Sequence, residues 1–315
     1  MTAARRAGRF GAVVTAMATP FDAEGQVDLD GAVALARYLT DNGSDGLVVT
    51  GTTGEGPTLT DSERIELWAA VARAVTVPMI AGSGTNDTAH SVELTRAASQ
   101  VGAAGILAVT PYYNRPSQSG IAAHFAAVAA ETTLPVLVYD IPVRTGRKVN
   151  LETMLQLVRD VPNIVGVKDA SGDPAGAARL VAAAGPEFDC YSGDDALTLP
   201  LLAVGAVGVV SVASHWVGRE LGEMIARFVE GDVEGARELN AALLEAIAFQ
   251  SSDDAPNPLP TKAVLRALGL PGGECRLPMG PAPDWLEPKA RSMLAKLEAW
   301  RSNRLARSAV AGPHA

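Results

Sequence analysis

Residues 163–183 read NIVGVKDASGDPAGAARLVAA and contain the unit from which most of the chain is built. Ile164 to Lys168 is a short apolar run, typical of a parallel strand that is buried on both faces. A polar turn follows, and Pro174 to Ala183 then has a helical pattern. The same alternation predicts strands over 11–18, 46–50, 77–82, 105–110, 135–140, 164–168, 188–192 and 208–212.

Helical patterns follow each of these strands and give eight strand–helix units before residue 230. Units of this kind close most naturally into an α/β fold of the (β/α)8 TIM-barrel type, with a doubly wound open sheet as the alternative. We expect the barrel to occupy residues 10–230. Only helical patterns occur over 231–302, which predicts a C-terminal helical extension, and residues 303–315 lack apolar periodicity, which predicts a disordered tail.

The composition excludes several classes of protein. The 315 residues are 48% hydrophobic and 19% charged, with a net charge of −9, which argues against nucleic-acid or anionic-membrane surfaces. No apolar run reaches membrane-spanning length and the N-terminus has no apolar leader, so we expect a cytoplasmic enzyme. Two cysteines and four scattered histidines show no metal spacing, and we expect neither a metal nor another cofactor.

Lys168 is an unusual residue for its position, because the chain has only five lysines and this one ends a buried strand. Burial disfavours the ammonium form, so the side chain must be paired or its pKa must fall. A neutral amine is a nucleophile that forms a Schiff base with a carbonyl substrate. The alternative is a structural ion pair with Asp169 or Asp194.

The residues at the other strand ends test the barrel hypothesis, because chemistry in this fold lies at the C-terminal ends of the strands. Hydroxyl groups and glycines suited to binding a carboxylate gather there, together with tyrosines and an arginine that could form a bidentate clamp. Each of these residue types also has a structural interpretation: the glycines could form only a tight turn, the tyrosines an amphipathic lid, and the arginine a surface ion pair. The candidate segments are 51–56, 110–114, 139–142 with Arg144, Lys168, 192–195 and Ser211.

Four motifs carry a resemblance to a known family. They are GTTGE at 51–55, TPYYN at 110–114, YDIPVRTG at 139–146 and GVKDASGD at 166–173. Together they resemble the dihydrodipicolinate synthase family, part of the pyruvate-dependent class I aldolase superfamily that also holds N-acetylneuraminate lyase. The similarity extends from Val13 to Met279, with the motifs in the family's order.

The resemblance implies four catalytic residues. Lys168 would form the Schiff base with pyruvate, and Tyr139 would relay protons and shape the pyruvate site. Thr52 would link Tyr139 to Tyr113, which a neighbouring subunit would supply across a tight dimer. The resemblance also implies a homotetramer built as a dimer of dimers.

The resemblance further implies a set of substrate-binding residues. Thr53 and Gly54 of the GTTGE turn would hold the pyruvate carboxylate, and Arg144 would bind the carboxylate of the second substrate. Gly193 and the carbonyl of Val210 would lie close to the pyruvate adduct.

The implied activity is that of a lyase that condenses pyruvate with L-aspartate-4-semialdehyde in diaminopimelate and lysine biosynthesis. Two alternatives stay open: a 2-keto-3-deoxy sugar-acid aldolase or dehydratase that uses the same imine, and a barrel that only binds an oxo acid. The pair Thr52 and Thr53, together with a basic residue at Arg144, favours the first activity over a sialic-acid lyase.

Some residues depart from the family pattern. Asp140 replaces the more usual asparagine, and Val143 replaces a small or polar residue. Lysine-inhibited members of the family carry a serine or alanine pair where this chain has Gly56-Pro57, and an acidic residue where it has His90. A histidine cannot replace a carboxylate that holds an ammonium group. We therefore expect weak or absent inhibition by L-lysine.

Overall fold

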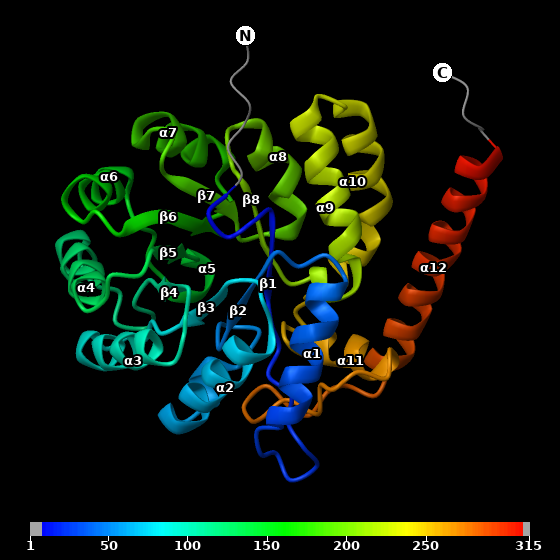
Figure 1. Cartoon of the computed structure of the whole chain (residues 1–315), viewed down its shortest axis with the longest axis horizontal. Helices are drawn as coiled ribbons and strands as arrows, with labels where there is room; N and C mark the ends of the chain where they lie inside the picture. Colours follow the sequence, from blue (N-terminus) through cyan, green and yellow to red (C-terminus); the bar gives the residue numbers. More distant parts are fainter. Residues whose placement is uncertain (1–7, 311–315) are drawn as a thin grey trace.

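Eight parallel strands form a closed barrel in the computed structural model, which describes residues 8–310. Each strand pairs with the next along the chain, and β1 pairs with β8 through Val13 and Val209, so the sheet has no edge. The helices surround the strands (Figure 1). The predicted TIM barrel is confirmed and the open-sheet alternative is excluded.

The strands are short and buried, as their apolar sequences predict. They are β1 Val13–Ala16, β2 Gly46–Val49, β3 Met79–Gly82, β4 Gly105–Val109, β5 Val136–Asp140, β6 Ile164–Asp169, β7 Asp189–Ser192 and β8 Gly208–Ser211. Alternate side chains of a strand point to opposite faces. Val14, Val48, Ile80 and Leu137 therefore fill the barrel interior, while their neighbours along each strand pack against the helices.

Five of the helices around the barrel, α1 to α4 and α7, begin at a capping side chain. Thr60 and Glu63 form a reciprocal capping box at the start of α2, and Asp173 accepts a hydrogen bond from the Gly176 N–H at the start of α7. The helices are α1 Leu29–Asp41, α2 Asp61–Ala74, α3 Thr88–Gln100, α4 Gln118–Ala130, α6 Leu151–Asp160, α7 Pro174–Ala184, α8 Thr198–Ala203 and α9 Ser214–Glu230.

Three short helical turns lie at the C-terminal ends of strands and position parts of the site. The turn α5, Pro142–Thr145, carries Arg144; Pro142 begins it and Gly146, with φ 73°, ends it. The sequence pattern did not predict this turn. The other two are the 3₁₀ turns η1, Gly56–Thr58, and η2, Asp195–Leu197.

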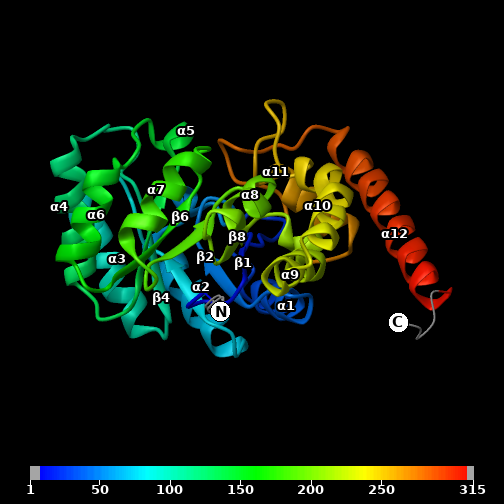
Figure 2. The same ribbon diagram turned by 90° about the horizontal axis from the view of Figure 1, so that it is seen from above.

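The C-terminal extension consists of α10 Val233–Ala248, α11 Leu259–Ala267 and α12 Leu286–Val310. Their apolar side chains form a second core with α9. Helix α12 runs along the edge of the molecule (Figures 1 and 2). Within the described part of the chain, no helix combines the length and apolarity needed to cross a membrane.

The end of α12 differs from the sequence expectation. The helix continues to Val310, so the tail expected from residue 303 is helical as far as the described residues extend. Arginines on one face of α12 explain this: Arg301 lies 2.6 Å from Glu220 and Arg304 pairs with Glu223, both on α9. Ion pairs to another helix can hold a segment that lacks an apolar stripe. The rest of the predicted tail, residues 311–315, lies outside the described part of the chain.

Candidate active site

Lys168 and Tyr139 lie side by side at the C-terminal ends of neighbouring strands. They are register partners in the β5–β6 pair, and the Lys168 Nζ lies 4.2 Å from the centre of the Tyr139 ring. Each side chain is buried, with 5% of its residue surface exposed. This arrangement places one amine and one phenol hydroxyl group at the same end of the barrel.

Lys168 makes no ion pair with Asp169 or Asp194 within residues 8–310. Asp169 follows Lys168 on the strand and therefore points to the opposite face, where it accepts a hydrogen bond from the Ser171 N–H at 2.8 Å. Asp194 accepts one from the Ala196 N–H at 2.9 Å. The structural alternative of a paired lysine does not describe this side chain.

Two small or apolar residues leave room beside Lys168. A Cβ on Gly193 would lie 3.0 Å from the Lys168 Cγ and 2.9 Å from the Ala170 Cβ, so only glycine fits there without movement. Val210, on β8, belongs to the same interior layer as Tyr139. Both predicted residues therefore lie inside the barrel at the end that carries the amine.

The GTTGE motif forms a compact turn after β2. The Gly56 N–H donates to the Gly51 carbonyl at 3.1 Å, and the Thr19 hydroxyl donates to the Gly54 carbonyl at 2.7 Å. A Cβ on Gly54 would lie 3.0 Å from both the Met17 carbonyl oxygen and the Thr50 nitrogen, which explains the glycine. The turn is therefore fixed by backbone contacts, and Thr53 is buried within it.

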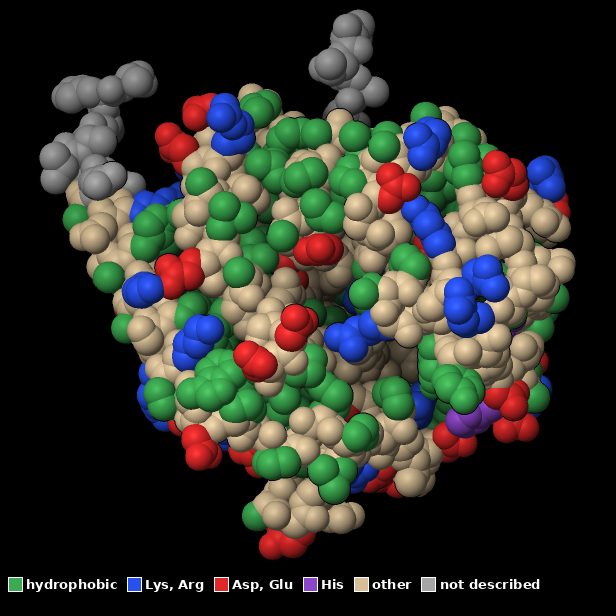
Figure 3. Space-filling model, turned by 180° about the vertical axis from the view of Figure 1, so that it is seen from behind, with side chains coloured by type: hydrophobic (Ala, Val, Ile, Leu, Met, Phe, Trp, Pro, Cys, Tyr) green, Lys and Arg blue, Asp and Glu red, His purple; other side chains and the backbone are tan. Residues whose placement is uncertain are grey.

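A cavity of about 230 Å³ opens next to these residues. It brings together three of the predicted side chains, Thr52, Tyr139 and Arg144, with Tyr112 and Arg64. Figure 3 shows a hollow near the centre of one face, with basic side chains at its border. A larger cavity, of about 500 Å³, lies between α1, α9 and α12, and no predicted site residue lines it.

Two of the four predicted catalytic residues do not line this cavity. Lys168 is connected to it through its contact with the Tyr139 ring, whereas Tyr113 lies outside it. Its side chain is 88% exposed, and its backbone has the left-handed φ of 69°, which is uncommon for a tyrosine. Tyr112, its neighbour, lines the cavity instead. An aromatic side chain held out into solvent is therefore available for contact with a second chain.

Asp140 follows Tyr139 and faces away from the barrel interior. It is buried, its register partner is Asp169, and it accepts a hydrogen bond from the Val149 N–H at 3.3 Å. Burial raises the pKa of Asp140 to about 7, with Asp169 adding to the rise, while the Val149 N–H and Lys148 oppose it. The sequence showed the replacement of asparagine at this position but could not show the burial.

Arg64 is a residue that the sequence reasoning missed. It lies on α2, is 5% exposed, lines the cavity and donates to the Gly56 carbonyl at 2.5 Å. It makes no ion pair with any acid in the part of the chain that the structure describes, and burial lowers the pKa of its guanidinium. A basic residue one turn into the helix after a glycine-rich turn was the available signal.

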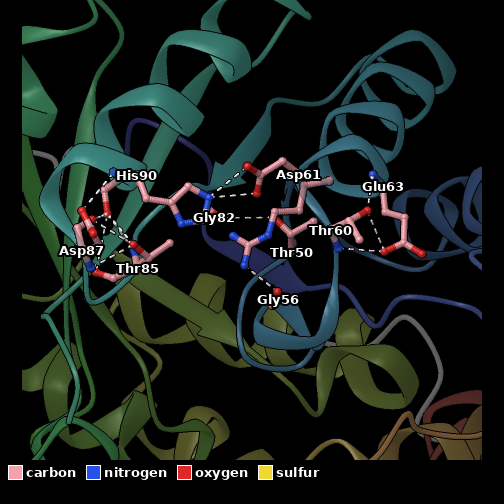
Figure 4. A network of polar contacts seen from close by, with 11 residues as sticks. Thr50, Gly56, Thr60, Asp61, Glu63, Gly82, Thr85, Asp87 and His90 are labelled. Carbon is pink, nitrogen blue, oxygen red and sulfur yellow. Dashed lines mark hydrogen bonds and ion pairs between the residues drawn. The ribbon is translucent and has the colours of Figure 1, made fainter.

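His90 lies close to the start of α2, the helix that carries Arg64, and its side chain contacts the carboxylate of Asp61. Its Nε2 lies 2.9 Å from the Asp61 Oδ1, which joins α3 to the first turn of α2 (Figure 4). The same close-up shows the Thr60–Glu63 cap and the Gly56 carbonyl beside this contact. The carboxylate near His90 is therefore already occupied by a side chain of this chain.

The fold and the site have the features of a Schiff-base-forming class I aldolase: at the mouth of a TIM barrel, a buried lysine lies beside a tyrosine and has no ion-pair partner among the described residues. The sequence pattern of the dihydrodipicolinate synthetase family matches residues 9–297. The chain belongs to this family.

Known relatives agree with this assignment. The chain is 50% identical over 273 residues to the 4-hydroxy-tetrahydrodipicolinate synthase of Moorella thermoacetica, which covers 86% of this chain and 92% of the relative. It is 46% identical over 274 residues to that of Bacillus subtilis, covering 86% and 94%. The solved structure of dihydrodipicolinate synthase from Cyanidioschyzon merolae with lysine bound has a TM-score of 0.87 and 44% identity, over 91% of this chain and 98% of that one.

Substituting Asp140→Asn tests its raised pKa. The folded protein binds a proton at Asp140 up to about pH 7, whereas the unfolded chain releases it near pH 4, so this group lowers stability as the pH rises between those values. Asparagine stays neutral and still accepts from Val149. We expect the variant to be more stable than the parent at pH 8, by up to about 4 kcal/mol, with a smaller difference at pH 5.

Denaturant unfolding at the two pH values measures this difference. The exposed Asp254→Asn variant is the control for loss of one negative charge. A stability difference for Asp140→Asn that is the same at pH 5 and pH 8 would contradict the assignment.

Proposed function

We propose that this chain condenses pyruvate with L-aspartate-4-semialdehyde, the reaction of the 4-hydroxy-tetrahydrodipicolinate synthases that it resembles. The observation that carries the proposal is the position of Lys168. Its amine is buried against the ring of Tyr139, which lines a cavity together with Arg144, and it has no carboxylate partner within residues 8–310. The reaction serves diaminopimelate and lysine biosynthesis.

In the proposed mechanism, the Lys168 amine attacks the ketone carbon of pyruvate and water leaves, which forms an imine. The imine withdraws electrons, so the pyruvate methyl group loses a proton and becomes an enamine carbon. That carbon attacks the aldehyde of the second substrate, and the aldehyde oxygen takes up a proton. The substrate's own amine then attacks the imine carbon, which closes the ring and releases Lys168.

The proton transfers need groups that alternate between donor and acceptor. Tyr139 lies against the lysine and lines the same cavity as Thr52, and these positions support a role for both hydroxyl groups in carrying protons between the imine and solvent. We assign the next position in this relay to Tyr113 of the partner subunit, because the exposed Tyr113 of a chain does not line its own cavity.

The two substrate carboxylates have separate sites in this proposal. Thr53 and the backbone of Gly54 bind the carboxylate of pyruvate with hydroxyl and amide donors. Arg144, on the short turn α5 at the border of the cavity, binds the carboxylate of the aldehyde substrate as a bidentate pair. Assays of pyruvate with aspartate-4-semialdehyde and with sugar-derived aldehydes separate this activity from that of a sugar-acid aldolase.

Reductive trapping tests the function directly. Incubation with pyruvate and borohydride should add one reduced pyruvate unit to the protein mass, because borohydride reduces the imine to a stable amine. Lys168→Ala should abolish this mass increase, while the exposed Lys296→Ala variant should retain it. An adduct that persists in Lys168→Ala would overturn the assignment of the nucleophile.

Arg144→Ala tests the assignment of the second carboxylate site. Loss of a charge-assisted contact costs about 1.5–3 kcal/mol, so the KM for the aldehyde should rise at least about tenfold or the turnover should fall comparably. Pyruvate trapping should persist, and Arg147→Ala, which alters a neighbouring exposed arginine outside the cavity, is the matched control. Loss of trapping with normal aldehyde kinetics would refute this role.

Tyr113→Phe tests the need for a second subunit. We propose that the active form is a homotetramer built from tight dimers, and that Tyr113 completes the site of its dimer partner. The substitution keeps the exposed ring and removes only the hydroxyl group, so turnover should fall while pyruvate trapping and oligomeric state stay unchanged. A monomer with full activity at the assay concentration, measured by sedimentation, argues against the shared relay.

L-lysine should inhibit this enzyme weakly. In lysine-inhibited members of the family, acidic and polar groups near Tyr112 would hold the ammonium of the effector. Here Arg64 places a buried positive charge at the cavity that Tyr112 lines, and Asp61 is occupied by His90. We expect an inhibition constant in the millimolar range or above at saturating pyruvate, with equal sodium chloride as the ionic-strength control; a lower constant would show that other residues form the effector site.

A further inference from the structure

Helix α11 and the segment before it reach back from the C-terminal extension to the GTTGE turn. Asn257 donates from its Nδ2 to the Thr53 Oγ1 at 3.0 Å, across 204 positions of the sequence. Both residues are buried, with exposed fractions of 7% and 1%. The extension therefore contacts the turn through a specific polar group.

The contact fixes the direction of the Thr53 hydroxyl proton. The amide nitrogen of Asn257 can only donate, so the Thr53 oxygen accepts from it. The Asn257 orientation is itself set, because its Oδ1 accepts from the Thr261 hydroxyl at 3.1 Å. The one proton of Thr53 is left to donate to another acceptor, and a substrate carboxylate offers only acceptors.

A second contact holds the next part of the turn. Glu55 has a left-handed φ of 53° and is 3% exposed, a conformation that needs support from its surroundings. The Lys262 Nζ lies 2.7 Å from the Glu55 Oε1, and the Arg276 N–H donates to the Glu55 Oε2 at 2.9 Å. The Lys262 side chain and the Glu55 side chain are each 1% exposed, so solvent does not screen their attraction.

The surroundings of Lys262 suit a buried cation. Its Nζ also donates to the Glu274 carbonyl at 2.9 Å and lies 4.0 Å from the centre of the Phe21 ring. Burial lowers the pKa of Lys262, and Glu55 opposes this fall. The extension therefore supplies both the cation and the backbone donor that keep Glu55 in its strained conformation.

We propose that Asn257 is a positioning residue for the reaction: it orients the Thr53 hydroxyl as a donor to the pyruvate carboxylate, while Lys262 holds the adjoining backbone. The inference rests on the proposed function, in which Thr53 binds that carboxylate. The C-terminal extension then acts on the substrate site through its contacts with Thr53 and Glu55.

Asn257→Asp tests the proton direction with an almost isosteric change. An aspartate at this position accepts the Thr53 proton and turns the hydroxyl away from the substrate. We expect the KM for pyruvate, and the pyruvate concentration that gives half-maximal trapping, to rise at least about tenfold. The KM for the aldehyde should change little, and the exposed Asn303→Asp variant is the matched control for the added charge.

Asn257→Ala provides a variant without a buried charge, in case the aspartate prevents folding. It removes the donor and should raise the KM for pyruvate in the same direction. If Asn257 only stabilises the fold, Asn257→Ala should lower the midpoint of thermal unfolding. The KM for pyruvate and the KM for the aldehyde should then change to the same extent.

A double-variant comparison shows whether Asn257 acts through Thr53. In a Thr53→Val background the hydroxyl is absent, so adding Asn257→Ala should cause no further rise in the KM for pyruvate. An unchanged KM for pyruvate in folded Asn257→Ala, or an equal rise in both backgrounds, would overturn the inference. Absence of trapping in the unmodified protein would instead overturn the proposed function.

Discussion

The site depends on the amine of Lys168, which is buried and has no carboxylate partner in the part of the chain that the structure describes. A carboxylate bound to this amine would have to be displaced before a ketone could react with it, whereas the ring of Tyr139 leaves the amine open to a carbonyl carbon. Closure of the barrel produces this environment. It places Lys168 beside Tyr139 by strand register and turns Asp169, the nearest acid in sequence, to the other face of the sheet.

The fold was predictable because its signals are local and repeated. Short apolar strands alternate with capped helices, and only a barrel or an open sheet accommodates eight such units. The positions of Lys168, Tyr139 and Arg144 at the C-terminal strand ends followed from the same pattern. Motif order then identified the family, since the four motifs fall on four different strand ends.

Other parts of the site depend on contacts that no local pattern contains. The hydrogen bond between Asn257 and Thr53 joins residues that are far apart in sequence. The raised pKa of Asp140 likewise depends on its burial in the folded chain, with Asp169 adding to the rise. The outward position of Tyr113 comes from a left-handed backbone in a segment without glycine. The helical structure beyond residue 302 could not be predicted for a related reason, because ion pairs from α12 to α9 hold a segment whose sequence lacks an apolar stripe.

The pairing of β1 with β8 has a consequence for how the chain is made. Parallel strands that are distant in sequence pair slowly, because a long loop must close before their contacts form. On the ribosome, Val13–Ala16 can pair with β2 early but meets β8 only after Gly208–Ser211 has left the exit tunnel. Until then both outer strands of the growing sheet present unpaired backbone groups, and the nascent chain is most exposed to aggregation during this interval.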